Sequence, residues 1–240
     1  MSKSFLDIID DNNSGVLALI DPDLKNDDIL DQLICSINSA NFSAILVGGS
    51  SISDNKYQQR LKLIKAKINK PVILFPGSSN QISQSADAIL FMSLLSGRNP
   101  KYLIDEQLKG VKLINKYDLP VISTGYLLIG TKSQTSIERI SQTNPLDPND
   151  YENILHHALV AQYFGMNCIY LENGSGAENV VDCSLIEYLF DNIKIPIIVG
   201  GGIRNKEDIV RLKKAGAKFV VISTILEENP TPEFISTILP

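Results

Sequence analysis

The sequence contains few residues of the kinds that build disulfide frameworks or metal clusters. It has three cysteines, Cys35, Cys168 and Cys183, and two histidines, His156 and His157. The cysteines are scattered without Cys-x-x-Cys spacing, which is typical of reduced thiols in a cytoplasmic protein. Neighbouring residues on a helix point about 100° apart, so the two histidines do not clamp one metal ion from one face. We therefore expect a cytoplasmic location and no disulfides.

Long apolar runs and an excess of basic residues are missing as well. No run of about 18 apolar residues occurs, so no transmembrane helix is expected. Transient contact with a membrane surface, where a lipid substrate would be met, stays compatible with the sequence. Residues 1–14 lack the basic start and apolar core of a signal peptide. The formal net charge of −5 argues against nonspecific nucleic-acid binding.

Short apolar runs rich in β-branched residues recur along the chain. The 240 residues are 44% hydrophobic and 20% charged, which is enough for a sizeable core. Runs that are apolar almost throughout are typical of strands buried on both faces of a parallel sheet. Such strands are predicted at residues 16–20, 44–47, 72–75, 88–92, 121–123, 168–171, 197–199 and 219–222.

Stretches of helical periodicity separate these strands, at residues 28–40, 101–117, 149–164 and 206–215. Asn205 is the predicted N-cap of the last helix, and Gly216 is its predicted stop. Residues 81–87 are too short for a full helix, and residues 131–150 form a predicted long loop on the catalytic face. The pattern predicts an α/β protein, a single (β/α)8 barrel of the TIM type over residues 1–240, with a shortened helix after the third strand. A doubly wound open sheet is the alternative.

The segments after the last strands are candidates for a phosphate site, because these barrels place their sites at the carboxyl ends of the strands. Glycines let backbone N–H groups approach an anion, and a helix beginning just beyond adds its positive dipole end. Tight turns that only close the barrel are the alternative interpretation. The candidate residues are Glu172, Asn173, Gly174, Ser175 and Gly176, then Gly200, Gly201 and Gly202, and finally Ser223 and Thr224.

Acidic side chains follow the first and sixth strands. Asp21 is a candidate metal ligand, because aspartate oxygens suit Mg²⁺, and Ser50 offers a hydroxyl ligand from the neighbouring strand end. A turn or capping role before Pro22 is the alternative for Asp21. Glu172 directly precedes the glycine loop, where a carboxylate is placed to accept a proton from an attacking hydroxyl. Its alternative role is to anchor the loop as a hydrogen-bond acceptor.

Motifs in the same order along nearly the whole chain resemble one family. They are Leu19-Ile20-Asp21-Pro22-Asp23, Val47-Gly48-Gly49-Ser50, Leu74-Phe75-Pro76-Gly77, Phe91-Met92-Ser93-Leu94-Leu95 through Arg98-Asn99-Pro100, Ser123-Thr124-Gly125-Tyr126, Tyr170-Leu171-Glu172-Asn173-Gly174-Ser175-Gly176-Ala177 and Val199-Gly200-Gly201-Gly202-Ile203-Arg204. In these motifs the chain resembles the geranylgeranylglyceryl phosphate synthases and their heptaprenylglyceryl phosphate synthase relatives.

The resemblance implies a prenyltransferase that joins sn-glycerol 1-phosphate to a long polyprenyl diphosphate through an ether bond and releases pyrophosphate. It implies Mg²⁺ held by Asp21 and Ser50, and Glu172 as the residue that orients or deprotonates the attacking hydroxyl. Glycerol phosphate would contact residues 170–176, Gly201-Gly202 and Ser223-Thr224. The resemblance also implies a homo-oligomer. Plausible lining for an apolar prenyl groove is Phe75, Phe91, Leu94, Leu95, Tyr126 and Leu127, with plain core packing as the alternative role for several of them.

The chain departs from the family pattern at a few positions. Lys25 comes one residue later than the family's lysine, and the segment 144–148 lacks the family's arginine, whose fork suits phosphate oxygens. Ser223-Thr224 replaces a pair that begins with glycine. These differences keep other readings open: a prenyltransferase with another phosphorylated acceptor, a noncatalytic phosphate-binding barrel, or an isomerase of the histidine or tryptophan biosynthetic type. The last one ordinarily needs a carboxylate where Ser123-Thr124 stands.

Overall fold

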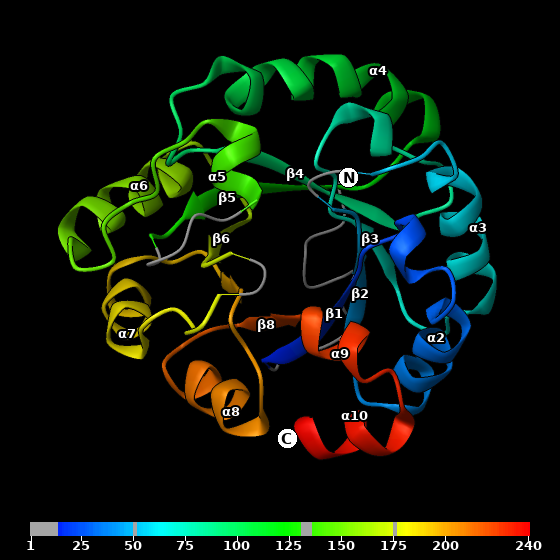
Figure 1. The fold of residues 1–240 in the computed structure, drawn as a ribbon. Coiled ribbons are helices and arrows are strands. Elements are labelled where there is room, and N and C mark those ends of the chain that lie inside the picture. The colour runs from blue at the N-terminus through cyan, green and yellow to red at the C-terminus, as the bar shows by residue number, and fades with distance from the viewer. Residues whose placement is uncertain (1–13, 50–51, 131–135, 175–176) are drawn as a thin grey trace.

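The chain folds around a closed barrel of eight parallel strands, which pair with one another in chain order (Figure 1). The structure is a computed structural model, and it describes residues 14–49, 52–130, 136–174 and 177–240. Because β1 also pairs with β8, the sheet has no free edge, and the predicted barrel is confirmed over the open sheet. The strands are β1 Gly15–Ile20, β2 Ala44–Val47, β3 Val72–Leu74, β4 Ala88–Leu94, β5 Val121–Leu128, β6 Cys168–Glu172, β7 Ile197–Gly200 and β8 Phe219–Ile222.

Side chains alternate between the two faces of each strand, and this divides the core into a layer inside the barrel and a layer beneath the helices. In β1, Leu17 points into the barrel, whereas Val16 and Ala18 pack beneath the helices. Successive side chains of a strand point to opposite faces, so a strand with apolar residues at every position is buried on both sides. Large side chains such as Phe219 and Tyr170 fill the interior of the barrel. The interior of the barrel is therefore filled by side chains, and a ligand would bind at the rims of the barrel.

Helices surround the barrel on the outside (Figure 1). Asn205 caps α8 by accepting a hydrogen bond from the N–H of Asp208, and Gly216 follows the helix with a φ of 110°, as predicted. Between β3 and β4 the chain forms only the 3₁₀ turn η2 Ser79–Gln81, which confirms the shortened connection. The other elements are η1 Leu24–Asn26, α2 Leu30–Ser39, α3 Tyr57–Lys67, the π-helical turn η3 Lys101–Asp105, α4 Glu106–Tyr117, α5 Ser136–Ser141, α6 Tyr151–Tyr163, α7 Cys183–Asn192, α8 Lys206–Lys214, α9 Thr224–Glu228 and α10 Pro232–Ile238.

Residues 131–150 differ from the predicted long loop. The described part of this segment contains α5, and Leu146 forms a parallel β-bridge with Ile129 beyond the end of β5. The prediction of a segment without regular structure is therefore wrong there, since backbone pairing to the barrel rim orders it. Helices α3, α7, α9 and α10 also lie outside the predicted helical stretches. In the part of the chain that the structure describes, no helix is long and apolar enough to cross a membrane.

Candidate active site

A polar pocket lies at the carboxyl ends of β6, β7 and β8. Its space, which opens to solvent, is about 840 Å³. Residues from all three strand ends meet here although they are far apart in sequence. Those predicted to form the phosphate site and found in the lining are Tyr170, Glu172, Gly201, Gly202, Ser223 and Thr224.

The turn after β7 requires glycine for two separate reasons. Gly201 has a φ of 90° and Gly202 a φ of 73°, a region that disfavours residues with a Cβ. A Cβ built on Gly201 would lie 2.8 Å from the backbone nitrogen of Gly174 and 2.9 Å from Oε1 of Glu172. Among the described residues, neither N–H of this glycine pair has a hydrogen-bond acceptor. The turn can therefore present backbone N–H groups to an anion in the pocket.

Glu172 occupies the position that connects the two glycine loops. Its carboxylate is buried, with the whole residue only 5% exposed. Oε1 accepts a hydrogen bond from the N–H of Gly174 at 2.6 Å, and Oε2 accepts one from the Tyr126 hydroxyl at 3.0 Å. Burial raises the pKa of Glu172 above its usual value, although these bonds and one from the Tyr170 hydroxyl act against the rise. A carboxylate with a raised pKa in a pocket is suited to accepting a proton from a substrate hydroxyl.

Three aromatic rings cross the rim beside this carboxylate. Tyr170 stacks on Phe75 and on Tyr126, with 5.2 Å between the ring centroids in each pair. Burial raises the pKa values of Tyr126 and Tyr170 well above the usual value, so both hydroxyls stay protonated and donate to Glu172. Tyr170 lines the polar pocket, whereas Phe75 and Tyr126 line a second hollow. The aromatic stack is therefore the boundary between two cavities.

The second hollow is an apolar groove between η2, β4 and α4. It has about 900 Å³ of space open to solvent. Phe75, Phe91, Leu94 and Tyr126 line it, as the sequence predicts. Leu95 and Leu127 do not line it and are buried in the layer beneath the helices. Other lining residues are Gly49, Ile82, Leu90, Met92, Tyr102, Gln107, Gly110 and Ile114.

Asp21 lies just beyond the end of β1, next to Gly49 of the groove. Its Oδ2 forms an ion pair with Lys25 at 3.1 Å, and Lys25 also pairs with Glu227 of α9 at 3.3 Å. Its Oδ1 is buried and has no hydrogen-bond partner among the described residues. A Cβ built on Gly49 would lie 2.6 Å from this oxygen. Burial raises the pKa of Asp21, whereas the hydrogen bond and the positive charge of Lys25 lower it. A buried carboxylate oxygen without a partner is a suitable ligand for a hard cation.

Several predicted residues lie away from the pocket or outside the described chain. Leu171 points into the layer beneath the helices, and the side chain of Asn173 donates to the carbonyl of Asn179 at 2.6 Å. Leu171 is a core residue and Asn173 holds the loop, and neither lines the pocket. Gly174 contributes through the hydrogen bond that its N–H donates to Glu172. Ser50, Ser175 and Gly176 lie outside the described residues.

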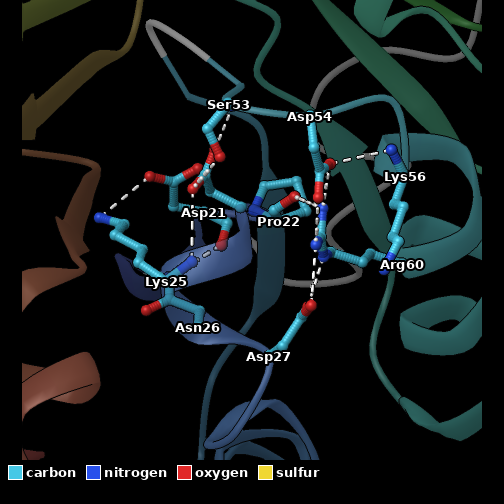
Figure 2. A network of polar contacts seen from close by, with 10 residues as sticks. Asp21, Pro22, Lys25, Asn26, Asp27, Ser53, Asp54, Lys56 and Arg60 are labelled. Carbon is cyan, nitrogen blue, oxygen red and sulfur yellow. Dashed lines mark hydrogen bonds and ion pairs between the residues drawn. The ribbon is translucent and has the colours of Figure 1, made fainter.

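A polar network behind Asp21 was not predicted from the sequence. The guanidinium of Arg60, from α3, contacts Asp27, Asp54 and the carbonyl of Pro22 (Figure 2). Arg204, the last residue of the segment that follows the seventh predicted strand, lines the polar pocket directly after the glycine turn. Nothing in the sequence pairs residue 60 with residues 22, 27 and 54.

The fold and these cavities define a class: a TIM-type barrel in which a polar pocket and an apolar groove lie on either side of an aromatic stack beside a buried glutamate. The chain matches the PcrB family over residues 7–239, and it belongs to that family.

Curated relatives and solved structures agree with this assignment. A geranylgeranylglyceryl phosphate synthase from Flavobacterium johnsoniae is 42% identical over 91% of this chain and 90% of its own length. The structure of the wild-type synthase from Thermoplasma volcanium has a TM-score of 0.88 and 35% identity, covering 98% of both chains. The (S)-3-O-geranylgeranylglyceryl phosphate synthase from Thermoplasma acidophilum, solved with its substrate sn-glycerol-1-phosphate, has a TM-score of 0.89 and 31% identity, covering 99% of this chain and 97% of that one.

Proposed function

We propose that this protein is a prenyltransferase that makes geranylgeranylglyceryl phosphate from sn-glycerol 1-phosphate and geranylgeranyl diphosphate. One observation carries the proposal: Glu172 and the Tyr126–Tyr170 stack lie between the polar pocket and the apolar groove. A small phosphate ester fits the pocket, and an isoprenoid tail fits the groove. Their reacting ends would then meet at the buried carboxylate.

The acceptor binds through its phosphate and reacts through its hydroxyl. Backbone N–H groups of Gly201 and Gly202 and the hydroxyls of Ser223 and Thr224 bind the phosphate. The hydroxyl oxygen attacks the first carbon of the prenyl chain, forming the C–O ether bond while the bond from carbon to diphosphate breaks. Glu172 accepts the hydroxyl proton, and pyrophosphate leaves with the electron pair. Alignment of two bound reactants can contribute about 7–11 kcal/mol to lowering such a barrier.

Asp21 fits a Mg²⁺ ion that neutralises the diphosphate. Its Oδ1, which has no hydrogen-bond partner in the described part of the chain, lies against Gly49 of the groove lining, so an ion held there would be next to a diphosphate bound at this side of the groove. Mg²⁺ commonly uses one or two protein carboxylates together with substrate phosphates, so a single aspartate is sufficient. Ser50 is the proposed second ligand. When held by Asp21 and Ser50, Mg²⁺ would balance the charge of pyrophosphate and so make it a better leaving group.

The proposal is tested by identifying the product. Purified protein is incubated with geranylgeranyl diphosphate, Mg²⁺ and either sn-glycerol 1-phosphate, its enantiomer or a phosphoglycerate, and the lipids are analysed by mass spectrometry. We expect the prenyl ether of sn-glycerol 1-phosphate and no turnover after the metal is removed with EDTA. A prenyl ether formed only with a phosphoglycerate would mean that the acceptor is a phosphoglycerate and not sn-glycerol 1-phosphate. The absence of any ether would support a noncatalytic phosphate-binding barrel. Turnover that continues in EDTA would refute the metal assignment.

A further inference from the structure

The structure holds a buried arginine outside the two cavities, where the proposed mechanism has no use for it. Arg60 is only 5% exposed, although it is a charged residue on a surface helix. Burial of a charge is costly, so such a residue is normally fully paired. Its partners, shown in Figure 2, come from the two segments that begin at the carboxyl ends of β1 and β2.

Arg60 uses every nitrogen of its guanidinium group. Nε and Nη2 donate to the two carboxylate oxygens of Asp27, the second at 2.8 Å. Nη1 and Nη2 donate to the carboxylate of Asp54 at 2.7 and 2.8 Å. Nη1 also donates to the carbonyl of Pro22 at 3.4 Å. Two bidentate pairs on one planar fork fix both position and orientation, which a lysine ammonium cannot do.

The partners connect the segment after β1 to the segment after β2. Pro22 and Asp27 flank η1 in the first segment, and Asp54 lies in the second, just before α3. A second bridge joins the same two segments: Asp23 accepts from the N–H of Ser53 at 2.5 Å and from its hydroxyl at 2.8 Å. The two loops are therefore joined by two separate sets of polar contacts close to Asp21.

The carbonyl that Arg60 holds belongs to the residue directly after Asp21. A shift of Pro22 moves the backbone of Asp21, and with it the carboxylate whose Oδ1 is packed against Gly49. The network also carries charge, since Asp21, Asp23, Asp27 and Asp54 are all acidic. Without Arg60 this acidic group would have less compensation at the place where an anionic diphosphate must approach.

We infer that Arg60 is a positioning residue for the diphosphate half of the site, holding Asp21 in the geometry that binds a divalent cation. This inference rests on the proposed function, because it takes Asp21 as the ligand of the metal that meets the diphosphate. Arg60 itself touches neither cavity. Its effect should therefore appear in metal binding and leave binding of glycerol phosphate unchanged.

Lys65 offers a matched control on the same helix. Its ammonium pairs with Asp87 at 2.6 and 2.7 Å, and Asp87 also accepts from the N–H of Val72. This ion pair ties α3 to the beginnings of β3 and β4, at the opposite end of the barrel from Asp21. Loss of the Lys65 pair tests whether any weakened anchoring of α3 would affect the metal site.

The test measures cation binding without turnover. Mn²⁺ is titrated into wild type, Arg60→Lys, Arg60→Met, Asp54→Asn and Lys65→Met in the presence of inorganic pyrophosphate, and free Mn²⁺ is followed by electron paramagnetic resonance. Loss of an outer partner of a metal ligand typically weakens metal binding about 10- to 100-fold. We expect a loss of that size in both Arg60 variants, a smaller loss in Asp54→Asn and none in Lys65→Met. Calorimetry should show unchanged affinity for sn-glycerol 1-phosphate throughout.

Two results would overturn the inference. One is Mn²⁺ binding by Arg60→Lys at wild-type strength, and the other is an equal loss in Lys65→Met, which would indicate general loosening. If Arg60→Met does not fold, Arg60→Lys and Asp54→Asn still decide the question. If wild type makes no prenyl ether while the Arg60 variants lose Mn²⁺, the proposed function fails and the positioning role stands. If wild type is active and Arg60→Lys binds Mn²⁺ normally, only the positioning role fails.

Discussion

Replacement of Gly201 by alanine should weaken the binding of glycerol phosphate and also lower the stability of the fold. The change adds one methyl group at a residue whose φ is 90°. That methyl would lie 2.8 Å from the backbone nitrogen and from the carbonyl oxygen of Gly174, and 2.9 Å from Oε1 of Glu172. Because two of these neighbours are backbone atoms, a change of rotamer cannot relieve the contact.

The expected magnitudes follow from these contacts. A Cβ in left-handed backbone costs about 1–2 kcal/mol, and crowding in a packed site adds about 1–3 kcal/mol. For a chain of this size each kcal/mol lowers Tm by roughly 2–4 °C, so the drop should be near 10 °C. A displaced turn also loses hydrogen bonds to the phosphate, each about 1.5–3 kcal/mol for a charged acceptor. Affinity for glycerol phosphate should therefore fall by about 10- to 100-fold.

Gly165 provides the control, because it shares the strain and lacks the contacts. Its φ is 73°, and nothing lies within 4 Å of a Cβ built on it. Gly165→Ala should lower Tm by the strain alone and leave substrate affinity unchanged. Calorimetric titration of sn-glycerol 1-phosphate, together with thermal unfolding, compares the two variants. Wild-type affinity in Gly201→Ala, or an equal loss in Gly165→Ala, would refute the placement of the phosphate at this turn.

Further predictions concern the carboxylate and the groove. Glu172→Gln should lower turnover by about 10²–10⁴-fold, the usual contribution of a general base, with little change in KM for glycerol phosphate. The raised pKa of Glu172 means that folding favours its protonated form, so wild type loses stability as pH rises from 4.5 through the raised value. Thermal unfolding at several pH values should show the Tm of Glu172→Gln rising relative to the Tm of wild type over that range. A difference in Tm that does not change with pH would contradict the burial of the Glu172 carboxylate as the cause. Gly110→Val should narrow the groove beside Ile82 and raise KM for the prenyl diphosphate but not for glycerol phosphate, as initial rates with each substrate varied will show.

Elements that are buried on both sides could be predicted from the sequence, and partly exposed ones could not. Each strand is apolar at nearly every position because it faces both the barrel interior and the helix layer. Helix α3 buries only Tyr57, Arg60, Leu61 and Ile64, and its lysines and glutamines obscure the apolar stripe. A pattern that depends on one narrow buried face is weaker than one that fills a strand.

Leu95 and Leu127, two of the candidates for the groove lining, instead have the core-packing role that was the alternative for several of these residues. Leu94 and Tyr126 face the barrel axis, and each next residue, Leu95 and Leu127, faces outward. One step along a strand reverses the side-chain direction, so adjacent residues belong to different layers. Ile89 and Leu90 of β4 belong to different layers and both line the groove, so membership of a layer does not by itself decide which residues reach the groove.

By itself, the sequence determined the order of strands and the glycine and carboxylate chemistry at their ends, because burial and backbone conformation restrict residue types locally. Only the tertiary structure decided which of those ends meet. The register that pairs Glu172 with Gly200 places the carboxylate beside the glycine turn, and the stack of Tyr126 on Tyr170 joins pocket to groove. The ion pairs of Arg60 with Asp27 and Asp54 join residues up to 33 positions apart in the sequence, and a local sequence pattern cannot predict such a contact.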